Sequence, residues 1–230
     1  MRALLVTLGM VYVLSFGSTA VAAERMNVLV MGDSFMTSNG SARQSVPHVL
    51  SSLLKTRVKS KAVTGARHLY RLPITGALGM NISKQYRPGK WDVVVMNGGG
   101  NDLWMGCGCG KCTRKMARLI SPDGKRGAIP SVVARARADG ARVIYVGYLR
   151  SPGRGSPIEG CKPLGDALEA RIAKLAARDP GMTFVTLADM VPFGDRSFHA
   201  ADMIHPSPKG SAAAARRVAE AIKKAQKSSF

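Results

Sequence analysis

Three short polar segments of this 230-residue chain carry residue types that together can do chemistry on an acyl group. Gly-Asp-Ser ends at Ser34, Gly-Gly-Asn-Asp contains Asn101, and Asp-x-x-His runs from Asp202 to His205. A serine hydroxyl becomes a good nucleophile only when a neighbouring base accepts its proton. We expect His205 to be that base. Asp202, three residues earlier, would lie on the same side of one helical turn and orient the imidazole ring. These residues predict ester cleavage or acyl transfer through an acyl-serine intermediate.

The negative oxygen that develops during attack on an acyl group needs hydrogen-bond donors already in place. Three donors are expected: the backbone N–H of Ser34, the backbone N–H of Gly65 and the side-chain amide of Asn101. Gly65 stands in Val-Thr-Gly-Ala, and Gly79, in Ala-Leu-Gly-Met, is the alternative for this role. Glycine at such a turn lets the main chain approach the substrate without an interfering Cβ.

Other polar residues near these segments have simpler interpretations. His199 is a competing base, but the acid that precedes it, Asp195, is four residues away. Asp33 and Asp102 are expected to fix local turns through backbone hydrogen bonds. Trp104 suits the lining of an acyl pocket and suits plain packing equally well.

The apolar pattern of the chain predicts the elements that must position these residues. Unbroken runs such as Val93-Val94-Val95 are typical of strands covered on both faces. Five strands are expected, at residues 27–31, 58–63, 91–96, 142–148 and 182–187. Segments with apolar residues at helical spacing follow these strands. The alternation predicts a single α/β domain over residues 24–230, a three-layer α/β/α sandwich around a mostly parallel five-stranded sheet.

Each of the first two polar segments, and Gly65, comes just after a predicted strand. Open parallel sheets bind their ligands at the carboxyl ends of their strands. We therefore expect Ser34, Gly65 and Asn101 to meet at one edge of the sheet.

The chain resembles the SGNH hydrolases, also called the GDSL esterase/lipase family. Gly32-Asp33-Ser34, Gly100-Asn101-Asp102 and Asp202-x-x-His205 are similar to blocks I, III and V of that family, in the same order and spacing. The resemblance covers nearly all of residues 24–230. It implies an SGNH/flavodoxin-like fold and a carboxylic ester hydrolase that needs no metal or organic cofactor.

The resemblance also implies a role for each matching position. Ser34 would be the nucleophile, and the pair Asp202 and His205 would activate it. Asn101 and the block II glycine, for which Gly65 is preferred, would complete the oxyanion hole. The chain departs from the GDSL pattern at its fourth position, where phenylalanine stands in place of leucine at a packing site.

The N-terminus has the layout of a secretory signal peptide, predicted for residues 1–23. A basic residue at position 2 precedes an almost wholly apolar run, residues 3–16, and small residues follow. An uncleaved membrane anchor is the alternative, but the run is short for a span of about 20 residues. A periplasmic or secreted location is expected for the mature chain, which would begin near Glu24.

Four cysteines, Cys107, Cys109, Cys112 and Cys161, make up the whole cysteine content of the chain. An even number in an oxidising compartment predicts two disulfides. A four-thiolate zinc site is the alternative, although Cys-x-Cys-x-x-Cys lacks paired two-residue knuckles. The pairing cannot be read from the sequence, but Cys161 would staple its own loop to the cysteine-rich one. That insertion is expected to shape the mouth of the substrate site.

The formal net charge of +20, with an isoelectric point near 10.5, favours anionic partners through long-range attraction. Nucleic acid is not expected, because no recognised nucleic-acid motif or aromatic-interleaved basic strand is present. For an exported protein, anionic lipid, lipopolysaccharide or polysaccharide is the more natural partner. A solvated basic surface without a specific ligand is the competing interpretation.

Together these observations predict an exported serine esterase that cleaves carboxylic esters, possible substrates being an anionic cell-envelope lipid or an acylated sugar. Two alternatives remain open. One is an acyltransferase or acetyltransferase acting on envelope polysaccharide, and the other is a non-catalytic binding protein of the same fold.

Overall fold

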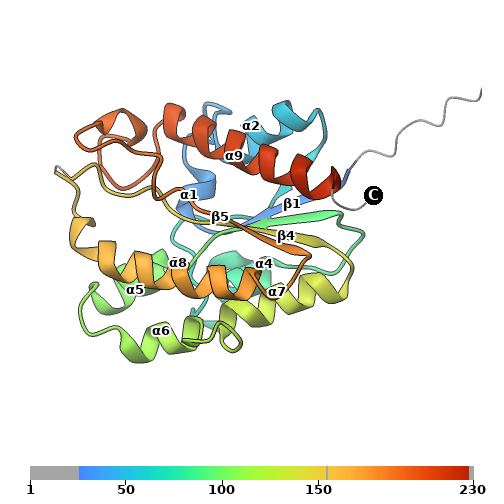
Figure 1. Ribbon diagram of the computed structural model, residues 1–230, viewed down its shortest axis with the longest axis horizontal. Helices are drawn as coiled ribbons and strands as arrows, with labels where there is room; N and C mark the ends of the chain where they lie inside the picture. Colours follow the sequence, from blue (N-terminus) through green and yellow to red (C-terminus); the bar gives the residue numbers. More distant parts are fainter. Residues whose placement is uncertain (1–25, 154, 228–230) are drawn as a thin grey trace, which may run out of the picture.

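The computed structural model describes residues 26–153 and 155–227. Five parallel strands form one sheet in the order β2-β1-β3-β4-β5. Figure 1 shows the sheet between layers of helices. The strands are β1 (Val28–Met31), β2 (Val58–Ser60), β3 (Val93–Met96), β4 (Arg142–Val146) and β5 (Met182–Val185). The predicted signal peptide, residues 1–23, lies outside the described residues.

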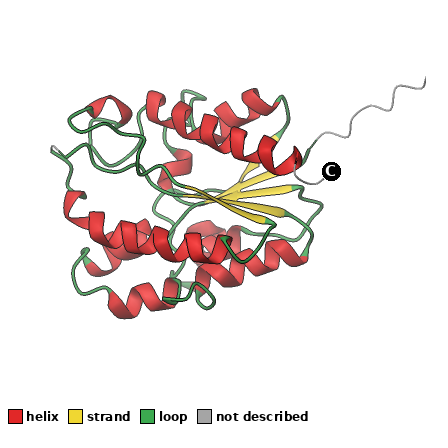
Figure 2. Cartoon of the chain, viewed as in Figure 1, coloured by secondary structure: helices red, strands yellow, loops and turns green. Residues whose placement is uncertain are grey.

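Helices cover both faces of the sheet, which confirms the predicted three-layer sandwich (Figures 1 and 2). One face carries α1 (Ser34–Thr37), α2 (Val46–Leu54) and α9 (Pro208–Lys227). The other face carries α4 (Ile82–Gln85), α5 (Gly100–Cys107), α6 (Thr113–Leu119), α7 (Ala128–Ala138) and α8 (Lys162–Ala176). Shorter turns are α3 (Pro73–Thr75), the π-helical η1 (Gly76–Met80), η2 (Glu159–Cys161) and η3 (Arg196–Phe198).

Two apolar cores lie on opposite faces of the sheet. Successive side chains of a strand point to opposite faces, so the central strands contribute to both cores. Val93 and Val95 pack with α2 and α9, whereas Val94 packs with α4 to α8. All three are buried, in agreement with a strand covered on both sides.

Strand β2 is shorter than predicted. It ends at Ser60, but the chain continues beside β1, because Lys61 N–H donates to Val30 O and Val63 N–H donates to Gly32 O. β2 is an edge strand, and its Lys59 and Ser60 are exposed. A polar edge strand of this kind lacks the apolar partners that extend the central strands.

Helix α9 has the strongly two-sided pattern that its sequence predicts. It buries a stripe made of Ala214, Ala215, Val218 and Ile222, and it presents basic residues on the opposite side. Across residues 26–153 and 155–227, no helix combines the length and the apolar character that crossing a membrane requires.

The carboxyl edge of the sheet is where the predicted site residues begin their helices. β1 and β3 pair in parallel with Met31 opposite Met96, so the two strands end side by side. Helix α1 begins at Ser34 shortly after β1, and α5 begins at Gly100 shortly after β3. The fold therefore brings Ser34 and Asn101 to one edge, as the sequence predicts.

Candidate active site

The predicted nucleophile, Ser34, is the first residue of α1 and is 9% exposed. The turn before it depends on glycine. Gly32 has φ +146°, and a Cβ at this position would lie 1.9 Å from Asn97 Oδ1. The Gln85 side chain grips the same residue, because it accepts from Gly32 N–H (2.7 Å) and donates to Gly32 O (2.8 Å). The backbone that presents Ser34 is therefore held from two sides.

Asp33 is buried beside the nucleophile and caps α1. Its Oδ1 accepts from Phe35 N–H (3.0 Å), as expected for a local turn, and also from Asn97 Nδ2 (3.3 Å) at the end of β3. Its Oδ2 accepts from the Tyr148 hydroxyl (2.6 Å). Burial raises the pKa of Asp33 above its ordinary value, although these hydrogen bonds and the nearby His205 oppose the rise.

The predicted base and its partner are in direct contact. His205 Nδ1–H donates to Asp202 Oδ2 (2.5 Å), and the backbone N–H groups of His205 and Ile204 donate to Asp202 Oδ1 (3.0 Å each). Burial raises the pKa of Asp202, but these hydrogen bonds outweigh burial and lower it to about 2. Asp202 therefore remains a carboxylate that fixes the ring tautomer and leaves His205 Nε2 free.

The connection between Asp202 and His205 is not the helical turn that the spacing predicts. Met203 has φ +58°, in the left-handed region, and the segment is a bend outside any helix. The two side chains still meet, because both backbone N–H groups after Met203 fold back onto the Asp202 carboxylate.

Ser34, Asn101 and His205 line one cleft at the carboxyl edge of the sheet. The hydrogen bond expected between Ser34 Oγ and His205 is not among those formed by the described residues, although both side chains face this cleft. Such contacts are often long in an unliganded enzyme and tighten when substrate binds.

Asn101, the predicted side-chain donor, is anchored at the start of α5. Its Nδ2 donates to Ala66 O (3.1 Å), which uses one of its two N–H groups and leaves the other for a ligand. This bond ties α5 to residues 63–66. The same segment touches α1, where the hydroxyls of Thr37 and Thr64 are 2.7 Å apart.

Gly65 lies in that segment with φ +78°, between Thr64 and Ala66, although it is not among the residues that line the cleft. Gly79 is buried elsewhere. Its carbonyl accepts from Gln85 Nε2 (2.8 Å), and a Cβ there would lie 2.6 Å from Val63. The contacts place Gly65, rather than Gly79, beside Ser34 and Asn101, and its role as a donor remains a prediction.

Tyr148 is a site residue that the sequence reasoning missed. Its hydroxyl donates to Asp33 Oδ2 (2.6 Å) and accepts from Gly100 N–H (3.2 Å), so it connects the turns that carry Ser34 and Asn101. Burial raises the pKa of Tyr148 well above its usual value, and the hydroxyl stays protonated. Tyr148 follows β4 at the same sheet edge, and that position was the signal available in the sequence.

Asp102 acts over a longer range than the local turn expected for it. Its carboxylate accepts from His68 N–H (2.9 Å) and Leu69 N–H (2.8 Å), and it therefore holds the chain that follows Gly65. Burial raises the pKa of Asp102 against the opposing effect of these two bonds.

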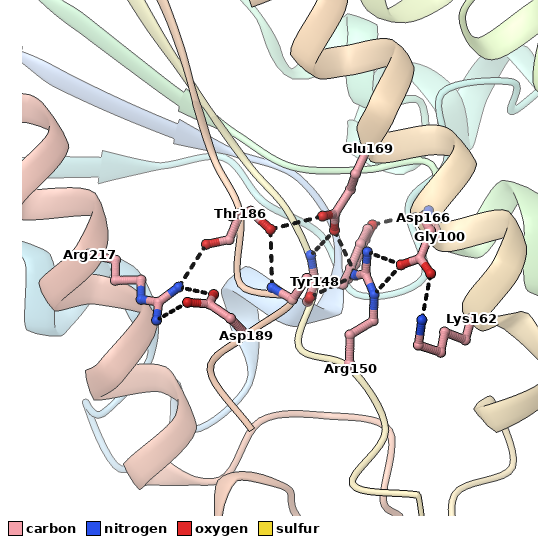
Figure 3. Close-up of polar contacts among 10 residues, drawn as sticks. Gly100, Tyr148, Arg150, Lys162, Asp166, Glu169, Thr186, Asp189 and Arg217 are labelled. Atoms are coloured by element: carbon pink, nitrogen blue, oxygen red, sulfur yellow. Dashed lines mark hydrogen bonds and ion pairs between the residues drawn. The ribbon is translucent and has the colours of Figure 1, made fainter. Parts of the chain in front are cut away.

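Behind Tyr148 a polar network runs from α8 to α9 (Figure 3). Glu169, 7% exposed, accepts from Tyr148 N–H (3.1 Å), Arg150 (2.7 Å) and the Thr186 hydroxyl (3.2 Å). Arg150 is shared with Asp166, which also pairs with Lys162. A buried carboxylate with three donors is well satisfied, so this network fixes the backbone at Tyr148.

The remaining histidines are placed differently from His205. His199 is buried, neither ring nitrogen has a partner within the described part of the chain, and burial lowers its pKa despite Asp202 and Asp195 nearby. Burial also lowers the pKa of His68 to about 3. Neither residue lines the cleft, so the structure favours His205 as the base.

The cysteines form two disulfides, Cys107–Cys112 and Cys109–Cys161. The number of bridges agrees with the prediction, and Cys161 is joined to the cysteine-rich loop as expected. Cys109 and Cys161 line the cleft together with Trp104. The cleft is open to solvent, and most of its lining is apolar.

Comparison with known proteins identifies a matching family model and similar structures. Residues 30–213 match the model of the GDSL-like lipase/acylhydrolase family. No curated protein matches the chain. Among solved structures, the chain is similar to a protein of Slackia heliotrinireducens assigned to the SGNH hydrolases, with 26% identity and a TM-score of 0.60 over 85% of this chain and 98% of that one.

Two further structures share the fold at lower identity. A carbohydrate esterase family 2 enzyme with a carbohydrate-binding domain, from Corynascus thermopiles (Myceliophthora fergusii), is 17% identical with a TM-score of 0.61, over 90% of this chain and 68% of that one. A GDSL-like lipase from Bacteroides thetaiotaomicron is 19% identical with a TM-score of 0.57, over 86% of this chain and 88% of that one.

Proposed function

The chain belongs to the GDSL-like lipase/acylhydrolase family and is a carboxylic ester hydrolase, and we propose that it is an exported enzyme that works through an acyl-Ser34 intermediate on esters of the cell envelope. The observation that carries the mechanism is the Asp202–His205 pair in the same cleft as Ser34 and Asn101.

In the first half-reaction, His205 Nε2 accepts the proton of Ser34 Oγ as this oxygen attacks the ester carbonyl. The negative oxygen of the tetrahedral intermediate accepts from Ser34 N–H, the free Asn101 N–H and the backbone at Gly65. The intermediate collapses, and the alcohol leaves with the proton held by His205. Water then attacks the acyl-serine by the same route, which returns Ser34 and releases the acid.

Two features support a substrate located at an anionic envelope surface. They are the positive net charge of the chain and one exposed apolar segment. The chain carries a net charge of +20. Leu72, Ile74 and Leu78 are 62%, 77% and 75% exposed on the α3–η1 segment, next to the exposed Arg71. Apolar side chains beside basic ones are suited to anionic lipid, because both the headgroup charge and the acyl layer are engaged.

An acylated sugar is the other ester we consider, since a carbohydrate esterase has this fold. Export is supported by the layout of residues 1–23 and by two disulfides, which persist in oxidising compartments.

The first experiment is hydrolysis of p-nitrophenyl acetate, butyrate and octanoate by the mature protein, with Ser34→Ala beside it. We expect the mutant to lose about 10⁴-fold or more in kcat/KM, because the oxygen that forms the acyl-enzyme is removed. Ser131→Ala is the matched control, since its hydroxyl bonds Gly127 O on α7 and is exposed. Equal loss in both variants, or full activity in Ser34→Ala, would contradict the mechanism.

The surface proposal is tested with an ester-bearing lipid in vesicles that contain either anionic or zwitterionic lipid. We expect faster hydrolysis on anionic vesicles, a decline with added salt, and a smaller advantage in Ile74→Ser/Leu78→Ser. Rates that are independent of vesicle charge and of salt would refute it.

Acyl transfer to a sugar hydroxyl is a second candidate. It is favoured by the access to the base, because the His205 side chain is 33% exposed and the cleft is open. Added acetylated and free sugars distinguish the two reactions: a transferase forms a new sugar ester in competition with water, whereas a hydrolase releases only acid.

A further inference from the structure

Most of the cleft is apolar, although the groups assigned to the reaction are polar. Beyond Ser34, Asn101 and His205, its lining includes the side chains of Leu103, Trp104, Leu149, Ile158, Leu168 and Ile204. An apolar lining of this kind binds hydrocarbon, because each buried methylene leaves water for apolar contact. The acyl half of an ester would occupy such a site better than a sugar would.

Two chain segments contribute most of the apolar walls of this cleft. One is α5, which begins beside Asn101 and contributes Leu103 and Trp104. The other runs from Ile158 through η2 into α8 and contributes Ile158, Cys161, Gly165 and Leu168. Steps of three or four residues place these four on one side of a helix, so this side faces the cleft.

The Cys109–Cys161 disulfide joins these two walls. The two Cα atoms are 5.1 Å apart, and 52 residues separate them in the sequence. Cys109 lies just past the end of α5, whose last residue, Cys107, is roughly 9 Å along the helix from Asn101 at about 1.5 Å per residue. The covalent link therefore closes the cleft at a distance from the reacting groups.

We infer that the acyl chain of the substrate lies between α5 and α8, and that the Cys109–Cys161 disulfide is a specificity-determining wall that limits the length of the chain. The inference rests on the proposed function, since it takes Ser34 as the attacking group. It goes further in naming an acyl chain of limited length and the residues that select it.

The second disulfide provides a matched control. Cys107 is the last residue of α5 and Cys112 lies at the end of the loop that follows, but neither lines the cleft, and their separation in the sequence is only five. Removal of either bridge takes away one covalent link near α5, whereas only removal of Cys109–Cys161 separates the two walls.

The first test compares kcat/KM for p-nitrophenyl dodecanoate with that for p-nitrophenyl butyrate. In Cys109→Ala/Cys161→Ala we expect the dodecanoate-to-butyrate ratio to rise about fifteenfold, because two newly buried methylenes contribute about fourfold each. In Cys107→Ala/Cys112→Ala the ratio should stay within about twofold of wild type. No change in the first pair, or an equal change in both, overturns the inference.

A filling substitution tests the same wall without breaking a covalent bond, in case the double variant does not fold. A Cβ at Gly165 would have Arg150 Cζ as its nearest neighbour, at 3.9 Å, so there is room for a side chain that enters the cleft. Gly165→Leu should lower the dodecanoate-to-butyrate ratio about tenfold. Gly160→Leu is the control, because a Cβ there meets nothing within 4 Å and Gly160 does not line the cleft. A ratio that Gly165→Leu leaves unchanged contradicts the inference.

Binding without turnover separates this inference from the proposed function. The chain has two tryptophans, so Ser34→Ala/Trp91→Phe leaves Trp104 in the cleft wall as the one indole. We expect 12-bromododecanoate to quench its fluorescence saturably, and Gly165→Leu to weaken that binding about tenfold, whereas Gly160→Leu leaves it intact. If the variant bound in this way but the wild-type protein had no esterase activity, the proposed function alone would be refuted. Absence of quenching, or quenching that Gly165→Leu does not affect, would refute the acyl site whatever the activity.

Discussion

The two segments that bring the reacting side chains together are held in very different ways. The nucleophile turn, residues 32–35, is buried, with Asp33 1% and Ser34 9% exposed. Side chains from three other segments form hydrogen bonds with it: Gln85 from α4, Asn97 after β3 and Tyr148 after β4. Any displacement of this turn would break several buried hydrogen bonds at once, which is costly.

The base loop, residues 199–206, exposes its two functional side chains to solvent, although His199 and Met203 within it are buried. The side chains of Asp202 and His205 are 44% and 33% exposed. Its links to other segments include Asn39 Nδ2 donating to Pro206 O (2.9 Å) and the Ser156 hydroxyl donating to Met203 O (2.8 Å).

This difference in contacts indicates that the fold preorganises the nucleophile, whereas the position of the base depends on a few local hydrogen bonds. Such an arrangement agrees with the missing Ser34–His205 hydrogen bond, since a loosely held loop can complete that contact when substrate arrives.

Substitutions in the base loop should abolish activity and leave stability nearly unchanged. We expect His205→Ala and Asp202→Asn each to lower kcat by about 10⁴-fold, because the base is lost or its tautomer is wrong. The free energy of unfolding of His205→Ala in urea should stay within about 0.5 kcal/mol of wild type, as for other exposed positions. Asp202→Asn should lose somewhat more, because the Asp202 carboxylate accepts three hydrogen bonds.

Asp195→Asn is the matched control for that experiment. Asp195 precedes the competing histidine, His199, and bonds Ser197 and Lys209 rather than a ring nitrogen. A loss of kcat comparable to that of Asp202→Asn would overturn the assignment of the base.

Mild acid should lower the free energy of unfolding through a buried residue near the site, His68. The pKa of His68 is lowered from 6.5 to about 3 by burial, so below pH 6.5 the unfolded chain binds a proton that the folded chain does not. Stability is therefore lost as the pH falls from 6.5 toward 3, by up to about 5 kcal/mol at 1.36 kcal/mol per pKa unit. Urea unfolding measured between pH 7 and pH 4 should show this slope, and His68→Gln should flatten it.

The pKa of Asp202 is also lowered, but it affects stability over a different pH range. Its pKa is lowered to about 2, so the stability it contributes is present above its unfolded value near 3.9 and is lost only as the pH falls from there toward 2. Asp202→Asn should therefore leave the slope above pH 4 unchanged. If it flattened that slope as much as His68→Gln does, the contrast between the two regions would be wrong.

The sequence predicts the position of the buried nucleophile turn better than the conformation of the base loop. Unbroken apolar runs such as Val93–Val95 indicate buried strands, and strand ends indicate where Ser34 and Asn101 lie, because both signals are local. The contact between Asp202 and His205 was also predicted from spacing. Its conformation was not, since a left-handed residue at Met203 replaces the helical turn.

What the sequence did not reveal depends on contacts between distant segments. Tyr148 and Gln85 act on residues 115 and 53 positions away, and no periodicity marks a side chain whose partner is set by tertiary packing. The pairing of Cys109 with Cys161 likewise required the distance between their Cα atoms. Edge position explains the early end of β2, which composition alone did not predict.

Removal of the Tyr148 hydroxyl should damage both stability and activity, in contrast to the base loop. Tyr148→Phe leaves Asp33 Oδ2 and Gly100 N–H without this partner, and we expect a loss of about 1–3 kcal/mol in the free energy of unfolding. The turns of Ser34 and Asn101 lose their link, so kcat should fall about tenfold with KM little changed.

Tyr70→Phe removes a hydroxyl of the same kind from an exposed pair with Thr75, and it should change neither quantity measurably. Stability lost without any decrease in kcat would show that Tyr148 supports the fold but does not position the site.

The smallest effect is expected at one anchor of the base loop. Ser156→Ala removes the hydroxyl bonded to Met203 O, a single hydrogen bond that contributes about 0.5–1.5 kcal/mol. Because the base loop has few other links, we expect the lost bond to destabilise this loop alone. Amide exchange at Ile204 and His205 should accelerate about two- to tenfold, and kcat should fall by a similar factor. Amides of the buried nucleophile turn should exchange at the wild-type rate. If exchange accelerated equally in both segments, the loop would be coupled to the core, and the base would be as firmly preorganised as the nucleophile.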